Sequence, residues 1–246
     1  MEYPKVSVII PTYNRFEFLL YAIESVYNQK YPNFEIIVVN DCSTDKKYRE
    51  YKFPKEIKKV DLVINQKKVI GYISDGHIRN FGLEIASGKY IATLDDDDFW
   101  LPNKLFMQIE SLENSINKMS CTEGYIGEGK FTLEKKYQLY NSERFLKKIS
   151  KKHKKSLLKS LTNFEFPNEF DFNFIRIHNS IIASSVVVER ELLNFLGGFR
   201  PIPSSNDYAP DYDCWLGLLR LTNCNYIKEP LIYYDELHGY GREWEN

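Results

Sequence analysis

Residues 78–100 read IRNFGLEIASGKYIATLDDDDFW, and no other stretch of the chain says more about its fold class. The first part predicts a helix over His77–Ala86, and Gly88 ends it because glycine readily terminates helices. Tyr90–Leu94 is a short apolar run of the kind that forms a buried strand. It leads directly into four consecutive carboxylates, Asp95–Asp98. A helix, a buried strand and a polar turn in this order are typical of a parallel α/β sheet.

The same alternation begins near the amino end of the chain. Val6–Ile10 is predicted to be a buried strand that Pro11 closes, and the apolar spacing of the following residues predicts a helix. Glu35–Asn40 and the short Asp61–Ile64 are the next predicted strands. We therefore expect an α/β fold with a mostly parallel central sheet flanked by helices.

The second half of the chain is less regular, and its pattern is weak over residues 120–178. Lys147–Lys159 holds seven lysines and one histidine. This segment is either a basic face for an anionic acceptor or a membrane surface, or a solvated helix, and the balanced charge elsewhere favours the solvated helix. Ile181–Val188 predicts a strand, Glu189–Phe195 a short helix, and a last helix begins near Asp211.

Composition excludes several classes of protein. The 246 residues carry a formal net charge of −1, and 43% of them are hydrophobic. A packed core is therefore expected, and a general nucleic-acid binder is not, because such proteins cluster Lys and Arg against phosphates. No segment has the pattern of a signal peptide or a membrane span. These features predict a soluble cytoplasmic protein, with peripheral attachment to a membrane as the open alternative.

Three polar clusters follow predicted strands: Thr12–Arg15, Asp41–Asp45 and Asp95–Asp98. The carboxyl ends of parallel strands meet at one edge of a sheet, and α/β proteins bind their ligands there. The three clusters are therefore expected to line one pocket.

The four consecutive carboxylates are the strongest chemical signal. Held close together, they repel one another unless a cation lies among them. Their oxygen atoms suit Mg²⁺ or Mn²⁺, and Mg²⁺ commonly links one or two carboxylates to substrate phosphates. The alternative is a solvated loop in which Asp98 caps the next helix, but the preceding buried strand favours a metal site. Neither G-x-x-x-x-G-K-[ST] nor a G-x-G-x-x-G after the first strand is present to hold phosphates.

Five segments, in chain order, closely resemble the landmarks of the family 2 glycosyltransferases. They read VSVIIPTYNR, FEIIVVNDCSTD, IRNFGLEIASGKYIATLDDDDFW, ASSVVVERELLNFLGGF and APDYDCWLGLL, and they cover most of residues 5–220. The resemblance implies the GT-A Rossmann-like fold of nucleotide-diphosphosugar transferases. It also implies an inverting transfer from a nucleotide diphosphate sugar, usually a UDP-sugar, with Mn²⁺ or Mg²⁺. Residues 1–246 would form one GT-A domain, with 1–119 as its nucleotide-binding half and 120–246 as its acceptor-binding half.

The resemblance also implies roles for single residues. Those assigned to the nucleotide sugar are Pro11, Thr12, Tyr13, Arg15, Asp41, Arg79, Asp95 and Asp96. Within this set, Thr12 and Tyr13 would lie near the base, and Asp41 would accept a hydrogen bond from the uracil or the ribose. Asp97 matches the metal ligand of the family, while either Asp95 or Asp96 would contact the ribose or the sugar.

The resemblance places the catalytic base in PDYDCW, residues 210–215, which is similar to the family's Glu-Asp-Tyr-Asp-x-Trp except that Pro210 replaces the glutamate. The matching base is Asp211. An aspartate at this point could instead cap the helix, and the two roles are compatible because a helix N-terminus keeps a carboxylate ionised. Related enzymes often have a C-terminal histidine near the metal, and His238 is either that ligand or a surface histidine.

Three other functions stay open. A sugar nucleotidyltransferase would need a G-x-G-T-R-like segment where this chain has PTYNR. A Mg²⁺-dependent phosphoryl-transfer enzyme, such as a phosphatase or nuclease, would hydrolyse phosphate esters without a sugar acceptor. A non-catalytic sugar-nucleotide-binding module would have no need of both Asp97 and Asp211. The expected partners are a nucleotide-sugar donor and a glycan, protein or lipid-linked acceptor.

Overall fold

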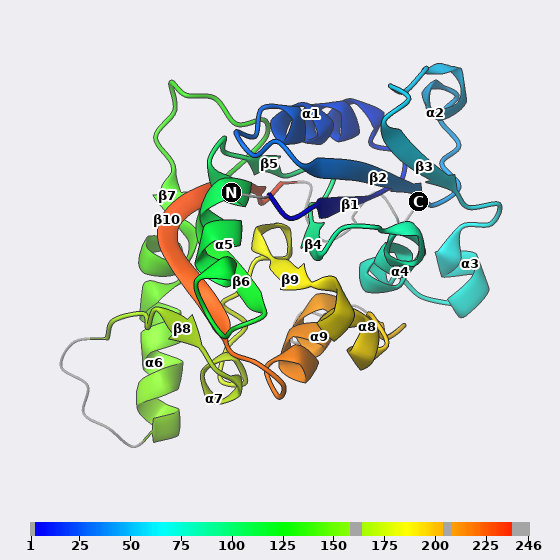
Figure 1. Ribbon diagram of the computed structural model, residues 1–246. Helices are drawn as coiled ribbons and strands as arrows, with labels where there is room; N and C mark the ends of the chain where they lie inside the picture. Colours follow the sequence, from blue (N-terminus) through cyan, green and yellow to red (C-terminus); the bar gives the residue numbers. More distant parts are fainter. Residues whose placement is uncertain (1–2, 158–163, 204–207, 238–246) are drawn as a thin grey trace.

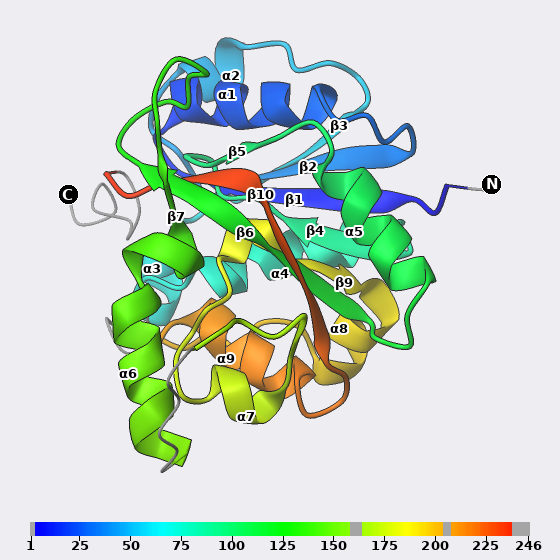
Figure 2. The same ribbon diagram turned by 90° about the vertical axis from the view of Figure 1, so that its left-hand side faces the viewer.

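The computed structural model describes residues 3–157, 164–203 and 208–237. These residues form a ten-stranded sheet with helices on both faces (Figures 1 and 2). Within them, no helix combines the length and the apolar character that crossing a bilayer requires.

The first half of the chain supplies one side of the sheet. Its elements are β1 (Val6–Thr12), α1 (Phe16–Tyr27), β2 (Phe34–Asn40), α2 (Lys47–Glu50), β3 (Ile57–Asp61), α3 (Gln66–Ile70), α4 (Asp75–Ile85), β4 (Tyr90–Thr93), β5 (Phe99–Trp100) and α5 (Lys104–Glu113). The second half contributes β6 (Met119–Gly127), β7 (Gln138–Leu139), the π-helical turn η1 (Tyr140–Arg144), α6 (Leu146–Leu157), β8 (Glu169–Phe170), α7 (Phe172–Ile175), the 3₁₀ turn η2 (Ala183–Ser185), β9 (Val187–Glu189), α8 (Arg190–Leu196), α9 (Pro210–Leu218) and β10 (Cys224–Asp235).

The strand order is β3-β2-β1-β4-β9-β6-β10-β5. The longer pairings, β1 with β2, β2 with β3, β1 with β4 and β6 with β10, are all parallel. Strand β9 lies between β4 and β6 and is antiparallel to both, so β6 and β10 run in the same direction as β1. The expected α/β fold with a mostly parallel sheet is confirmed.

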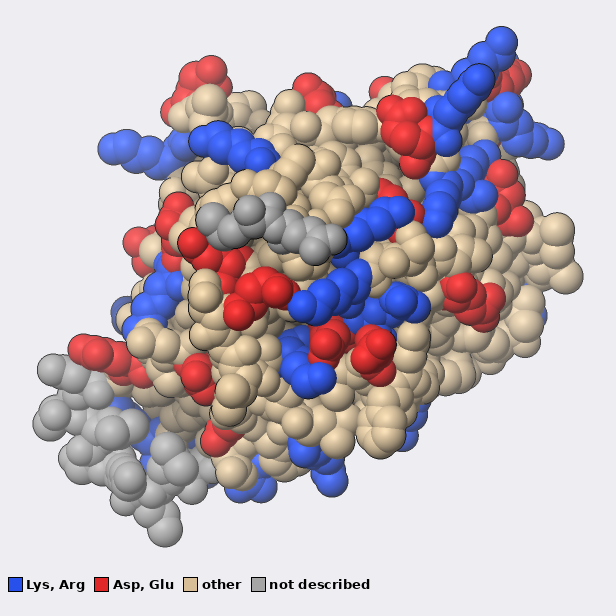
Figure 3. All heavy atoms as spheres, in the orientation of Figure 1, with Lys and Arg blue, Asp and Glu red and all other residues tan. Residues whose placement is uncertain are grey.

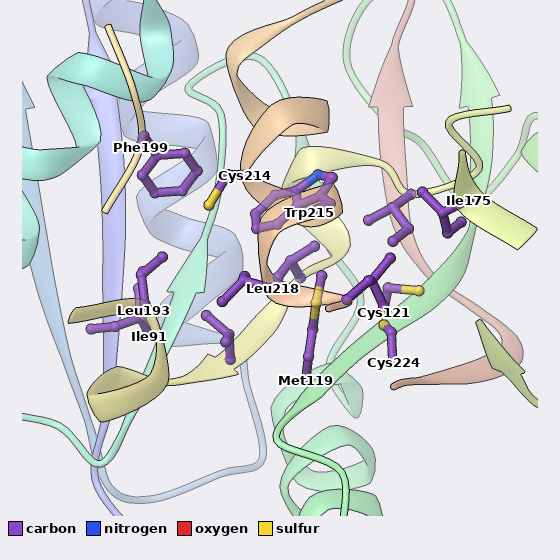
Figure 4. Close-up of a cluster of buried hydrophobic side chains, with 14 of the residues drawn as sticks. Ile91, Met119, Cys121, Ile175, Leu193, Phe199, Cys214, Trp215, Leu218 and Cys224 are labelled. Carbon is purple, nitrogen blue, oxygen red and sulfur yellow. The ribbon is translucent and has the colours of Figure 1, made fainter. Parts of the chain in front are cut away.

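Each face of the sheet has its own apolar core. Alternate residues of β1 point to opposite faces, so Val8 and Ile10 belong to one core and Ile9 to the other. Helices α1 and α5 cover the first face, and α4, α8 and α9 cover the second (Figure 2). Figure 4 shows Trp215 of α9 in the second core, between Leu193 on one side and Cys121 of β6 on the other. Both cores contain residues from both halves of the chain.

Three predicted strands differ from the structure. The Asp61–Ile64 strand is wrong, because β3 ends at Asp61, where its pairing with β2 ends. Val63 is then 91% exposed. The first strand continues through Pro11 to Thr12 instead of ending at Pro11. The Ile9 carbonyl accepts a hydrogen bond from the chain that continues β4, and the backbone of Pro11, two residues later, faces the same side. The pairing of β1 with β4 ends before Pro11. The missing N–H of Pro11 therefore removes no hydrogen bond between strands.

The predicted Ile181–Val188 strand is interrupted by η2, and only its end lies in β9. The turn is held by polar contacts: Trp100 donates its indole N–H to the Ser184 carbonyl, and Thr93 donates to the Ala183 carbonyl. Strand β6 lies where the sequence pattern is weak, and β10 lies in a segment for which no strand was predicted. Strand β10 is irregular around Pro230, where the register with β6 shifts.

Candidate active site

The loops after β1 and β2 are tied together at the carboxyl edge of the sheet. Asn14 has a positive φ of 52°, a conformation that asparagine tolerates better than most residues. Its side-chain oxygen accepts hydrogen bonds from the backbone N–H groups of Thr44 at 2.8 Å and Asp45 at 3.2 Å. The polar clusters that the sequence predicts at this edge therefore do meet. Asn14 was not among the predicted site residues.

The acidic turn after β4 forms ion pairs with two arginines from different elements. Arg15, after β1, forms ion pairs with Asp97 and, at 3.3 Å, with Asp96. Arg79, in α4, forms an ion pair with Asp95. The predicted residues Arg15, Arg79 and Asp95–Asp97 thus lie together.

Asp97 and Asp98 are both buried, but they have different surroundings. Burial raises the pKa of Asp97 to about 7, against the opposing effect of Arg15, and the neighbouring charges of Asp96 and Asp95 raise it too. Asp98 accepts a hydrogen bond from the Ser184 hydroxyl and another from the Asp235 backbone N–H at 3.0 Å. Asp98 therefore fastens the acidic turn to η2 and β10. The alternative that it caps the next helix is wrong, because Asn103 is the N-cap of α5.

Arg79 lies among three carboxylates and is 2% exposed. The charges of Asp95, Asp75 and Asp211 all raise its pKa, against the effect of burial. Its Nε atom is buried and has no hydrogen-bond acceptor among the described residues. Asp75 was missed by sequence reasoning. The available signal was its position in the first turn of α4, four residues before Arg79.

Asp211 lies in the first turn of α9, one residue after Pro210. The N-cap of this helix is Ala209, so the alternative that Asp211 is itself the N-cap is wrong. Burial raises the pKa of Asp211 to about 6, with Arg79 opposing the rise. The pKa of this carboxyl is thus close to neutral pH, as is favourable for a general base.

A close approach of α4 and α9 brings Arg79 and Asp211 together. A Cβ atom placed on Gly76 would lie 2.8 Å from the Cβ atom of Pro210 and 3.1 Å from that of Phe199. Only glycine allows this spacing.

The other residues predicted to bind the nucleotide include three that are buried, Pro11, Thr12 and Asp41. Asp41 is fully buried and accepts hydrogen bonds from the Asn65 side chain and the Gln66 backbone N–H, each at 2.8 Å. Burial raises its pKa to about 7. Thr12 is 1% exposed and shares a 2.6 Å hydrogen bond with the Tyr48 hydroxyl. Pro11 is buried in β1, and Tyr13 packs partly against the second core. His238 lies outside the described residues.

The acidic turn has suitable chemistry for a divalent cation. Asp95 and Asp97 offer hard carboxylate oxygens. The pKa of Asp97 is raised mainly by burial and further by the charges of Asp96 and Asp95, so a cation would favour its ionised form. The described residues contain no group of three or more His, Cys, Asp or Glu arranged to hold a metal. An ion here would therefore share its remaining coordination with phosphate oxygens and water, as Mg²⁺ commonly does.

Comparison with known proteins supports the resemblance. Residues 7–177 match the glycosyl transferase family 2. The chain is 29% identical over 226 residues to the Escherichia coli UDP-Glc:alpha-D-GlcNAc-diphosphoundecaprenol beta-1,3-glucosyltransferase WfgD, covering 90% of this chain and 72% of that protein. It spans only 15% and 63% of two further relatives, which are uncharacterized glycosyltransferases of Rickettsia bellii and Rickettsia typhi.

Two solved structures share the fold. One is S. aureus TarS 1-349 in complex with UDP-GlcNAc, with a TM-score of 0.62 and 20% identity over 96% of this chain and 59% of that one. The other is the mannosyltransferase PcManGT from Pyrobaculum calidifontis in complex with GDP-Man and Mn²⁺, with a TM-score of 0.62 and 17% identity over 99% of this chain and 60% of that one. These likenesses show the GT-A fold, and the match over residues 7–177 establishes that the chain belongs to glycosyl transferase family 2.

Proposed function

We propose that this chain transfers a sugar from a nucleotide diphosphate sugar, with a UDP-sugar as the expected donor, to an acceptor hydroxyl with inversion. The observation that carries the proposal is the position of Arg79, which is buried between Asp95 of the acidic turn and Asp211 of α9. Arg79, the proposed contact of the anionic donor, thus lies beside Asp211, whose pKa of about 6 suits a general base. The UDP-sugar in the printed name of WfgD supports this donor class.

Asp211 acts as the general base in this proposal. The acceptor oxygen forms a bond to the anomeric carbon, its proton passes to the Asp211 carboxylate, and the bond from that carbon to the diphosphate oxygen breaks. The bonding electron pair leaves with the nucleoside diphosphate. Because Asp211 is ionised above its pKa of about 6, it is ready to accept the proton at neutral pH.

The donor is held by the carboxyl edge of the sheet. Arg79 would direct its unpaired Nε–H toward a diphosphate oxygen, and Arg15 would contact the nucleotide once it leaves Asp97. Pro11, Thr12, Tyr13 and Asp41 would line the nucleoside. Either Asp95 or Asp96 would contact the ribose or the sugar.

Mn²⁺ or Mg²⁺ would be held by Asp97, and His238 is a further proposed ligand. When bound, the ion would neutralise the charge that grows on the departing diphosphate. Its presence in the structure of PcManGT supports this part of the proposal.

The two halves of the domain divide these tasks. Residues 1–119 supply the proposed nucleotide contacts and the metal ligand Asp97. Residues 120–246 supply the base, the acceptor side and the further proposed ligand His238. Among glycan, protein and lipid-linked acceptors, the diphosphoundecaprenol in the printed name of WfgD favours a lipid-linked one.

The test of this function is Asp211→Asn, which keeps the shape of the side chain but removes its basicity. We expect sugar transfer to fall by about 10²–10⁴-fold, while calorimetry shows donor binding within a few-fold of wild type. Glu191→Gln is the matched control, because it removes a carboxylate from the first turn of α8 and should leave transfer unchanged. Full transfer by Asp211→Asn would remove this residue from the role of base.

Release of inorganic phosphate from simple phosphate esters, with no transfer to any sugar acceptor, would instead identify a phosphoryl-transfer enzyme. Donor binding without any turnover would identify the non-catalytic binding module.

A further inference from the structure

We propose that α6 and the start of the segment after α7 form a docking surface for an anionic lipid bilayer. This surface, called the basic ridge below, consists of Lys147, Lys148, Lys151, Lys152, Lys154, Lys155 and Arg176. It lies outside the proposed active site. The inference does not depend on the transferase function, because it concerns where the protein binds and not what it catalyses.

The helix is built with one apolar side and one cationic side. Ile149 and His153 are buried, and both face the second core or its aromatic neighbours. All six lysines are exposed, and α6 contains no acidic residue. A helix of this length extends for about 18 Å, so its lysines form a continuous stripe. Strong amphipathic character with lysines on the polar face is typical of helices that lie on membranes.

The cations of the ridge differ from other surface lysines in their contacts with the described residues. None of its cations forms an ion pair with a described residue, whereas Lys47, Lys89 and Lys118 each pair with a glutamate. Asp171, just before α7, uses its carboxylate to cap that helix through the Phe174 N–H at 2.7 Å. Figure 3 shows basic and acidic side chains interspersed over much of the face that it draws.

A neighbouring histidine, His178, lies close enough to the ridge for two of its lysines to affect its pKa. Burial, together with the positive charge of Lys152 and Lys148, lowers the pKa of His178 to about 4. At neutral pH this histidine is uncharged, so the ridge holds its positive charge on lysine and arginine alone.

The ridge contains an open hollow. Lys152, Lys155, Arg176 and Ile177 line a depression of about 610 Å³ between α6 and the end of α7. Among the described residues, two elements therefore contribute cations to this hollow, with one apolar side chain beside them. A phosphate headgroup with the first part of its acyl chains has matching chemistry, because it presents an anion next to apolar surface.

The ridge borders the edge of the sheet at which the active site lies. Strand β6 runs in the same direction as β1 and β4, so its carboxyl end meets theirs, and β7 pairs with that end. The turn η1 and then α6 follow β7 directly. Figure 2 shows α6 on the side of the molecule toward which β6 and β10 run. A bilayer bound to the ridge would therefore lie beside the acceptor side of the site.

A bilayer fits these observations better than a nucleic acid or a soluble anion. A general nucleic-acid binder carries an excess of Lys and Arg, and the net charge of −1 provides none over the whole chain. The lysine stripe is long and exposed, which suits a flat charged surface more than a single small ligand.

Vesicle sedimentation tests the inference. We expect the full chain to bind vesicles of phosphatidylglycerol and phosphatidylcholine at low salt, and to be released from them at high salt because exposed charges are screened. It should not bind vesicles of phosphatidylcholine alone. Each cation near an anionic surface raises the partition coefficient about fivefold. The triple variant Lys151→Gln, Lys152→Gln, Lys155→Gln should therefore lose about a hundredfold in binding.

The matched control neutralises three exposed lysines elsewhere, Lys52→Gln, Lys55→Gln and Lys68→Gln, and has the same net charge. We expect it to bind the vesicles like the wild type. Equal loss in both triple variants, equal binding to neutral vesicles, or no binding at all would overturn the proposal.

Further measurements distinguish membrane binding from binding of a soluble anion and from misfolding of the variants. Saturable binding of inorganic phosphate or of RNA, abolished by Arg176→Gln in the absence of vesicle binding, would overturn the proposal and reassign the ridge to a soluble anion. Thermal melting should show that the ridge variants fold like the wild type. Transfer to a water-soluble acceptor should be unchanged in them, so a failure of this inference and a failure of the proposed function remain distinguishable.

Discussion

Arg15 and Arg79 approach the acidic turn from β1 and from α4, and each already binds a carboxylate that the proposed mechanism needs. Arg15 bonds Asp97, which is the expected metal ligand, and Arg79 bonds Asp95 while lying beside Asp211. Arg15 bonds one oxygen of the Asp97 carboxylate, and a divalent cation there would lie close to the guanidinium charge. Because two cations on one carboxylate repel each other, we expect Arg15 and the ion to compete for Asp97.

This competition can be measured without any turnover. We expect Arg15→Gln to bind Mn²⁺ about tenfold more tightly in the absence of nucleotide, because a hydrogen bond to a charged group no longer opposes the ion. Electron paramagnetic resonance of free Mn²⁺ gives the affinity. Lys47→Gln, which removes a cation from a surface pair with Glu17, should change nothing. Weaker Mn²⁺ binding by Arg15→Gln would mean that Arg15 does not compete for the site.

The pKa of Asp211 determines the pH dependence of the proposed reaction. Burial raises this pKa to about 6, so the carboxylate is protonated, and lost as a base, as the pH falls through about 6. With Mn²⁺ saturating, so that the bound ion holds Asp97 ionised, kcat/KM should fall tenfold for each pH unit below 6 and level off above 7. A profile that stays flat to pH 4.5 would contradict the assignment.

At the scale of elements, the packing of α4 against α9 sets the geometry of the site. Gly76 of α4 faces Pro210 and Phe199 so closely that no Cβ atom fits between them. Arg79 follows Gly76 by less than one helical turn, and Asp211 follows Pro210 directly. The separation between the guanidinium and the base therefore depends on one glycine.

Gly76→Ala tests this dependence. The added methyl group must push α9 away, because the atoms it meets are attached to the backbone, and we expect a loss of about 1–3 kcal/mol in the free energy of unfolding. The variant should remain folded and still bind the donor, but its kcat should fall by a larger factor than its donor affinity. Gly217→Ala adds the same methyl group at the other end of α9, where it meets the flexible end of Leu196, and should retain activity. If Gly76→Ala kept the wild-type kcat, the helix spacing would not control the base.

At the scale of the whole molecule, the two halves of the sequence are interleaved in one sheet. Strand β9 lies between β4 and β6, and β5 of the first half pairs with β10 of the second. Both apolar cores draw on both halves. The functional division at residue 119 is thus a proposed division of tasks within one cooperative unit.

A fragment of residues 1–119 is therefore not expected to fold alone. It would leave β4 as an unpaired edge and would remove Trp215, Leu193 and Val188 from the second core. Circular dichroism and proton NMR of the fragment should show no cooperative melting and poorly dispersed signals. A sharp two-state transition would instead demonstrate an independent nucleotide-binding domain.

The sequence alone determined the features that depend on neighbours along the chain. The apolar runs of β1, β2 and β4, the helix that ends near Gly88, and the acidic turn are local patterns, since burial of one strand or helix face imposes a short period on the residues. The five segments that resemble the family, in their order along the chain, further predicted the GT-A fold and the candidate residues Arg79, Asp97 and Asp211.

Tertiary structure decided the features that depend on partners far along the chain. Asp97 and Asp98 are alike in sequence, yet one meets Arg15 and the other meets Ser184 and Asp235. Asp211 lies beside Arg79 because α4 and α9 pack closely at Gly76. Strands β6 and β10 are positioned by their pairing with each other, and the register shifts around Pro230 interrupt the alternation of side chains along β10. A charged side chain acquires its role from the charges and the solvent exposure around it, and neighbours that fold together from distant segments set both.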